Sequence, residues 1–274
     1  MSKLKGFTLI EVTLFLAITA LLFIGIAMGM QNSVSQQRYN DSTQNFLEFM
    51  RSIYSKVSNP QTVGDGNSDE AIYGKLVVFG EETDIDGSAV SGTPVFVYDV
   101  IGRADTVVGS LGTGSVKVLL ERLNARVVRV TEWNSDKSVK KAELAAPEKY
   151  TPRWGAAIDG TGNGTPFAGS ILVVRHPRSG TINTLFYGEQ IDVNFEFESA
   201  KNSGNYDNVL KILSNKWDDF NGDRVINFCV NPVGANIRSN TTRQNIRILK
   251  NARNASDVEI IGLDTDDNAC KENT

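Results

Sequence analysis

A long apolar stretch near the start of the chain gives the first structural signal. From Val12 to Met30 no residue is charged, and the hydroxyls of Thr13 and Thr19, which interrupt the run, can bond to helix carbonyls. Extended back to Phe7, the stretch supplies the roughly 20 or more residues that a helix needs to cross a hydrocarbon core about 30 Å thick. The pattern therefore predicts a membrane-spanning helix over residues 7–30.

Residues 31–59 turn polar but keep an apolar stripe. Four apolar residues recur at spacings of three and four, which is the period of one helix face: Phe46, Met50, Ile53 and Val57. The stripe predicts that the helix continues beyond the membrane and packs on a sheet. The pair Asn59-Pro60 should end it, because the residue before a proline disfavours helical geometry.

Beyond residue 61, short apolar and β-branched runs predict strands. We expect them at residues 72–79, 94–100, 126–133, 170–175, 181–187, 224–230, 245–249 and 258–261. A turn from Pro177 to Gly180 should join two of them into a hairpin. The pattern predicts an α+β fold in which the long N-terminal helix packs on one antiparallel β-sheet.

The remaining segments are assigned from weaker patterns. Residues 116–123 fit either a strand or one face of a helix, and we favour a strand. In residues 190–198 apolar and polar positions alternate, which predicts a half-buried strand. The charged residues 137–150 and the Gly/Thr-rich residues 155–169 predict a long surface excursion. Residues 206–213 predict a short helix.

Composition narrows the kind of protein. Hydrophobic residues make up 41% of the 274 positions and charged residues 22%, which is ordinary for a globular protein with a sizeable core. The formal net charge of -4 supplies no broad positive field. We therefore do not expect nucleic acid as a partner.

Charge placement around the apolar run predicts its orientation and marks one unusual residue. Lys3 and Lys5 precede the run and no Lys or Arg follows until Arg38, so the first six residues should stay in the cytoplasm and the bulk of the chain should lie outside. Glu11 lies within the run, where a carboxylate costs about 2.5 to 3.5 kcal/mol on insertion scales. Such a residue is expected to have a partner and a function.

The sequence Ser-Lys-Leu-Lys-Gly over residues 2–6, followed by Phe-Thr-Leu-Ile-Glu over residues 7–11, resembles the class III leader of type IV prepilins and pseudopilins. The resemblance implies that prepilin peptidase cuts between Gly6 and Phe7 and that Phe7 becomes the N-methylated first residue. It also implies that Glu11 sets subunit register, by neutralising the Phe7 amine of a neighbouring subunit within the apolar filament core. A plain signal-anchored membrane protein, with Glu11 at the interface, is the alternative.

The resemblance implies a pilin-like organisation. Residues 1–6 would be the leader peptide, 7–30 the transmembrane and filament-core helix, 31–59 its amphipathic continuation, and 61–274 an extracytoplasmic β-rich globular domain. Removing the six leader residues from 274 leaves 268, which is large for this family and favours a minor pilin. A pseudopilin of a type II secretion or competence system, or a pilus-borne adhesin, are the alternatives.

The resemblance also implies the partners of the chain. They are other pilin subunits in a homo- or heteropolymeric filament, prepilin peptidase, the inner-membrane assembly platform, and the membrane itself before assembly. The chain would be a single-pass membrane protein with its N-terminus in the cytoplasm, and would end in an extracellular pilus. In an exported chain the only two cysteines, Cys229 and Cys270, are expected to form a disulfide.

Candidate chemistry is sparse. His176 is the sole histidine, so a histidine-based metal site or nucleophile activation has little to draw on, and we expect neither an enzyme nor a cofactor. Asp219, Asn221 and Asp223 surround Gly222 and form a weak calcium candidate, because carboxylate and amide oxygens suit a hard cation. The pattern lacks the bidentate glutamate of a calcium-binding loop, and we favour a plain turn.

Overall fold

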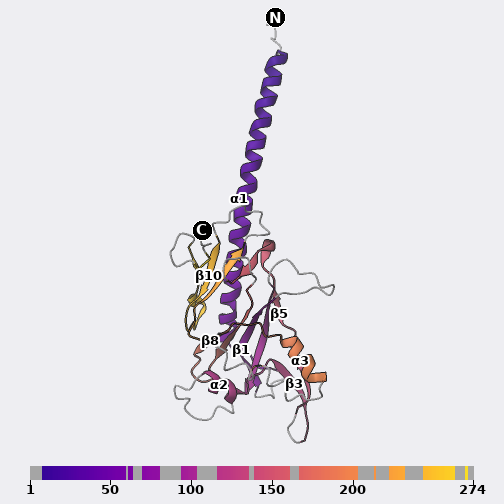
Figure 1. The fold of residues 1–274 in the computed structure, drawn as a ribbon, viewed down its shortest axis with the longest axis vertical. Coiled ribbons are helices and arrows are strands. Elements are labelled where there is room, and N and C mark those ends of the chain that lie inside the picture. Colours follow the sequence, from indigo (N-terminus) through magenta and orange to yellow (C-terminus); the bar gives the residue numbers. More distant parts are fainter. Residues whose placement is uncertain are drawn as a thin grey trace.

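The computed structural model places α1 (Leu9–Ser58) as a long helix that enters a globular α+β part (Figure 1). The residues it describes are 8–59, 61–63, 70–80, 94–103, 116–135, 139–160, 167–202, 213, 222–231, 243–262 and 269–270. The cleavage pair Gly6 and Phe7 therefore lies outside the described residues. The coarse prediction, a long apolar-then-amphipathic helix with antiparallel sheet, is confirmed.

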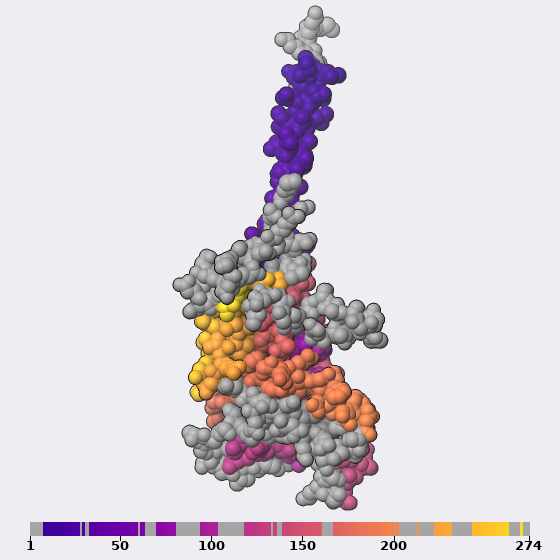
Figure 2. All heavy atoms as spheres, viewed as in Figure 1, coloured from indigo at the N-terminus to yellow at the C-terminus, as the bar shows by residue number. Residues whose placement is uncertain are grey.

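Helix α1 is continuous across the predicted change from apolar to amphipathic sequence. It has 50 residues, begins after the N-cap Thr8 and ends at the C-cap Asn59, next to Pro60 as expected. At 1.5 Å per residue it is about 75 Å long. Its first half stands clear of the globular part and its second half runs into it (Figures 1 and 2).

The central sheet has five antiparallel strands in the order β5-β2-β1-β7-β8. They are β1 (Glu70–Phe79), β2 (Val95–Arg103), β5 (Glu148–Tyr150), β7 (Gly169–Arg175) and β8 (Ile182–Tyr187). β7 and β8 form the predicted hairpin, and Gly180 takes the positive φ of +71° that its turn requires. Gly74 lies at a bulge in β1, where a Cβ would come within 2.6 Å of the Val173 carbonyl oxygen.

Two further sheets correct the expectation of a single one. A four-stranded antiparallel sheet has the order β11-β10-β9-β6, and among the described strands β3 and β4 form a two-stranded sheet. The strands are β3 (Val128–Trp133), β4 (Val139–Leu144), β6 (Ala157–Asp159), β9 (Ile226–Asn231), β10 (Gln244–Ile248) and β11 (Val258–Ile261). Short 3₁₀ turns η1 (Arg153–Gly155) and η4 (Ala255–Asp257) flank this second sheet.

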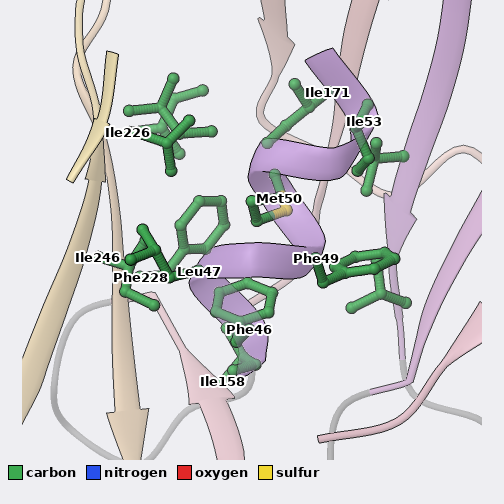
Figure 3. Packing of buried hydrophobic residues seen from close by; sticks show 14 of the residues in the cluster. Phe46, Leu47, Phe49, Met50, Ile53, Ile158, Ile171, Ile226, Phe228 and Ile246 are labelled. Carbon is green, nitrogen blue, oxygen red and sulfur yellow. The ribbon is translucent and has the colours of Figure 1, made fainter. Parts of the chain in front are cut away.

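The second half of α1 is the centre of the first core. Figure 3 shows Phe46, Met50 and Ile53 on this helix between residues of the central sheet and of the four-stranded sheet. The Phe46 ring is fully buried and meets the Phe228 ring edge-on at 5.5 Å between centroids. The predicted apolar stripe is confirmed, but it faces two sheets rather than one.

The other face of the central sheet carries a second core. Along β1, Val77 and Phe79 belong to the first core, while Leu76 and Val78 belong to the second. A strand buried on both faces reads as a continuous apolar run, which is why the sequence shows no alternation here. Helices α2 (Val116–Leu123) and α3 (Val193–Asn202), together with β3 and β4, cover this face.

Two predicted strands are helices. Residues 116–123 form α2, because the helical period gathers Leu119, Leu120 and Leu123 into the second core. Residues 190–198 contain the start of α3, in which Val193 and Phe197 are buried whereas Phe195 is 69% exposed. Positions four apart share a face in both periods, so the exposure of the residue between them is what identifies the helix.

The prediction of a long surface excursion over residues 137–150 and 155–169 was also wrong in part. Residues 137–150 contain β4 and β5, with Val139 and Ala142 buried, and residues 155–169 contain β6. The charges in this stretch occupy the outward positions of short strands. The predicted helix at 206–213 lies outside the described residues except for Leu213, which is buried.

Candidate membrane and assembly helix

The N-terminal half of α1 presents an apolar surface that nothing in the described chain covers. Over Leu9–Ala27 the mean hydropathy is 2.5, none of the stretch is buried, and it is long and apolar enough to cross a membrane. Its large apolar side chains are more than two-fifths exposed: Leu9, Ile10, Val12, Leu14, Phe15, Leu16, Ile18, Leu21, Leu22, Phe23, Ile24 and Ile26. A surface of this size needs lipid or protein around it.

Glu11 and Thr8 form a capping box at the start of this surface. The Glu11 Oε2 atom accepts hydrogen bonds from the backbone N–H and from the hydroxyl of Thr8, each at 2.9 Å. In return the Thr8 Oγ1 atom accepts from the Glu11 N–H at 3.3 Å. The box satisfies backbone donors that a helix start leaves open, and it fixes the carboxylate at the first turn.

The other polar groups in the apolar half are satisfied within the helix. The Thr13 hydroxyl donates to the Ile10 carbonyl at 3.0 Å and the Thr19 hydroxyl to the Phe15 carbonyl at 2.7 Å, as the sequence predicted. Gly25 and Gly29 have open space where a Cβ would stand. Glu11 is the one charged side chain in the apolar half of α1, and it lies in the first turn of the helix.

Polar anchors hold the second half of α1 in the globular part. The buried Tyr39 hydroxyl donates to the Val230 carbonyl at 2.8 Å and accepts from the Gln244 N–H at 2.6 Å, so one side chain ties α1 to β9 and β10. Burial raises the pKa of Tyr39 to about 12. The Arg51 guanidinium donates twice to the Val258 carbonyl, at 3.1 and 2.9 Å. These contacts hold the second half of α1 against the four-stranded sheet.

A second chain of buried hydroxyls lies about four helical turns after Tyr39. Tyr54 donates to Thr184 Oγ1 at 3.0 Å, and the Thr184 hydroxyl donates to the Ala252 carbonyl at 2.8 Å. Burial raises the pKa of Tyr54 to about 12. No sequence pattern predicted hydrogen-bonded anchors at Tyr39 and Tyr54, although Tyr39 stands seven residues before Phe46 and thus on the same helix face.

The two cysteines are joined in a disulfide between β9 and the C-terminal segment, in agreement with the predicted pairing. Cys229 is fully buried and Cys270 is 2% exposed. The bond spans 41 positions of sequence. It therefore links the end of the chain to the four-stranded sheet that packs on α1.

Only part of the calcium candidate lies within the described residues. Asp219 and Asn221 lie outside the described residues. The Asp223 carboxylate is 72% exposed, lies 3.2 Å from the Lys250 ammonium and accepts from Asn251 Nδ2 at 3.4 Å. These contacts lower the pKa of Asp223, first through the hydrogen bonds from Lys250 and Asn251. An ammonium group beside this carboxylate competes with a cation.

His176 has a structural role in the described hairpin. Its Nδ1 atom accepts hydrogen bonds from the backbone N–H groups of Arg178 and Ser179, at 3.2 and 3.1 Å, and so orders the β7–β8 turn. Partial burial, then the charge of Arg178, lowers the pKa of His176. Within the described part of the chain, no three His, Cys, Asp or Glu residues are grouped closely enough to hold a metal ion.

Comparison with family models, with curated proteins and with solved structures gives no match.

Proposed function

We propose that the chain is a type IV pilin-like structural subunit, processed by prepilin peptidase and assembled through the apolar half of α1. The observation that carries the proposal is the division of one continuous helix. Leu9–Ala27 is apolar and uncovered, while the half that contains Phe46 and Ile53 is anchored in two sheets. A subunit of this shape can exchange lipid for the helices of other subunits without unfolding its globular part.

Glu11 supports the same proposal. A carboxylate two residues into an apolar helix is costly unless it is bonded, and the capping box with Thr8 offsets part of that cost. A carboxylate offers about four acceptor positions, so Glu11 can accept from a second donor while the box persists. That donor would be the Phe7 amine of a neighbouring subunit after cleavage behind Gly6.

In the proposed function, α1 occupies two environments in turn. Before assembly, α1 spans the membrane with residues 1–6 in the cytoplasm, where prepilin peptidase and the assembly platform act. After assembly, the same helix lies in the core of an extracellular pilus, among other pilin subunits. In the described residues the globular part contains three sheets and two hydrophobic cores, one of which includes the second half of α1, and a globular part of this size supports a minor pilin.

The proposal is tested by incorporation into filaments. Glu11→Ala should strongly reduce the amount of this protein in sheared extracellular filaments, while the membrane-bound pool remains. Glu11→Gln should also reduce incorporation, because the amide keeps an acceptor for Thr8 but loses the charge. Glu48→Ala is the matched control, because Glu48 is exposed on the anchored half of α1. Normal incorporation of both Glu11 variants would refute the assembly role.

A further inference from the structure

Three exposed side chains gather where α1 leaves the globular part: Arg38, Arg153 and Trp154. The Arg38 guanidinium carbon lies 4.9 Å from the centroid of the Trp154 ring, and Ser42 donates to the Arg153 carbonyl at 3.0 Å. These contacts fix η1 against α1. The result is an aromatic ring with the Arg38 guanidinium beside the emerging helix, and Arg153 precedes that ring in the chain.

The backbone turns Trp154 outward. Its φ is +58° and its ψ is 25°, a left-handed conformation that is uncommon for a bulky residue, and Gly155 follows with φ of +67°. The neighbours Pro152 and Ala156 are buried, so the turn is held on both sides. Trp154 nevertheless remains 49% exposed. Strained residues of this kind persist where the surrounding structure enforces them, and they cluster at functional sites such as ligand clamps.

The position of Arg38 along α1 sets the distance between this cluster and a bilayer that α1 would span. The uncharged apolar run ends at Met30, eight residues before Arg38, so the two lie about 12 Å apart along the helix axis. The polar layer on each side of the hydrocarbon is roughly 5 to 8 Å thick. A helical arginine leans toward the helix N-terminus, here toward the membrane, and its long side chain covers the remaining distance. Asp41 lies almost one turn further from the membrane.

We propose that Arg38, Arg153 and Trp154 form a lipid-headgroup contact that seats the globular part on the membrane surface before assembly. The two guanidinium groups would donate paired hydrogen bonds to phosphate oxygens of phospholipids. The indole would lie at the boundary between headgroups and hydrocarbon, where tryptophan is enriched. This inference rests on the proposed insertion of α1, because only insertion brings the cluster to the lipid.

The test uses the full chain reconstituted in phospholipid vesicles that carry a nitroxide quencher on the headgroup. One variant keeps Trp154 alone, through Trp133→Phe and Trp217→Phe. The matched control keeps Trp133 alone, on β3 at the end of the globular part away from the apolar half of α1 (Figure 1). Trp154 emission should fall by about half or more relative to unlabelled vesicles, and Trp133 emission should stay unchanged.

Variants that remove charge test the contribution of the two arginines. Arg38→Gln combined with Arg153→Gln should weaken the quenching of Trp154, whereas Lys140→Gln combined with Lys141→Gln removes the same charge from β4 and should leave it unchanged. Equal quenching of Trp154 and Trp133 would overturn the lipid contact. Protection of Trp154 only in assembled filaments would overturn it too and assign the cluster to a neighbouring subunit. Flotation with the vesicles reports insertion separately, so failure of α1 to insert is distinguished from failure of the contact.

Discussion

The Oε2 atom of Glu11 accepts two hydrogen bonds from Thr8, one from its backbone N–H and one from its hydroxyl. The carboxylate that we propose as the register group of a filament is thus also a helix cap in the single subunit. One side chain can serve both purposes, because the box occupies only part of the acceptor capacity of a carboxylate. The cap holds that carboxylate in the first turn of the helix, four positions after Phe7, the N-terminal residue that we propose for the mature chain.

Thr8→Ala should loosen the first turn of α1. Losing an N-cap costs about 0.5 to 2 kcal/mol of helix stability, so the first-turn amides should exchange hydrogen faster in detergent micelles. Thr13→Ala is the control, because its hydroxyl bonds only to the Ile10 carbonyl in the same turn and caps nothing. Equal exchange in both variants would show that the box contributes nothing to the helix start.

Tyr39→Phe should destabilise the globular part by about 1 to 3 kcal/mol, since it leaves the Val230 carbonyl and the Gln244 N–H without their shared partner. Denaturant unfolding of the full chain in micelles measures the loss. Tyr187→Phe is matched in chemistry but removes a hydrogen bond to the exposed Glu189, where water can replace the phenol, so its cost should be smaller than that of Tyr39→Phe. A smaller loss for Tyr39→Phe than for Tyr187→Phe would contradict the anchoring role.

Reduction of the disulfide should lower the free energy of unfolding by about 3 to 4 kcal/mol, because it releases a constraint of roughly 40 residues on the unfolded chain. The midpoint of denaturant unfolding should fall on addition of a reductant. A double variant, Cys229→Ala with Cys270→Ala, should start at the lower midpoint and show no response to the reductant. A response in that variant would mean that the reductant acts elsewhere.

Stability should fall at alkaline pH. In the folded state burial raises the pKa of Tyr39 and Tyr54 from 10.0 to about 12, whereas in the unfolded state the phenols ionise near their ordinary value. The unfolded state therefore binds fewer protons between pH 10 and 12, and the free energy of unfolding decreases across that window. Each group contributes a slope of up to about 1.4 kcal/mol per pH unit. Unfolding followed by circular dichroism should show a shallower decline for Tyr54→Phe, and an identical decline would exclude this cause.

The sequence predicted best where one physical constraint dominates. The apolar half of α1 was predictable because spanning a bilayer demands an uninterrupted run, and the Phe46 to Val57 stripe because one helix face meets a core. The alternation at Val193, Phe195 and Phe197 misled because strand and helix periods coincide at every fourth residue. Tyr39 and the buried pair of Glu70 and Arg126, 2.5 Å apart, gave no local signal because their partners lie far away along the chain.

The pairing of strands in the four-stranded sheet also could not be predicted from local sequence. Strands β9, β10 and β11 were recognisable as short apolar runs, whereas β6 lies in a stretch predicted as a surface excursion. Phe228 packs on Phe46 from this sheet, and Phe79 packs on both from the other. Only the three-dimensional position of the helix decides that two sheets rather than one enclose it.

Mass spectrometry of the mature N-terminus in the native host tests the central claim most directly. Cleavage between Gly6 and Phe7 should yield a chain that starts at Phe7 and carries one added methyl group on its amine. A Gly6→Leu variant should remain uncleaved and stay in the membrane fraction. A mature chain that still starts at Met1 or Ser2 would contradict the pilin-like account.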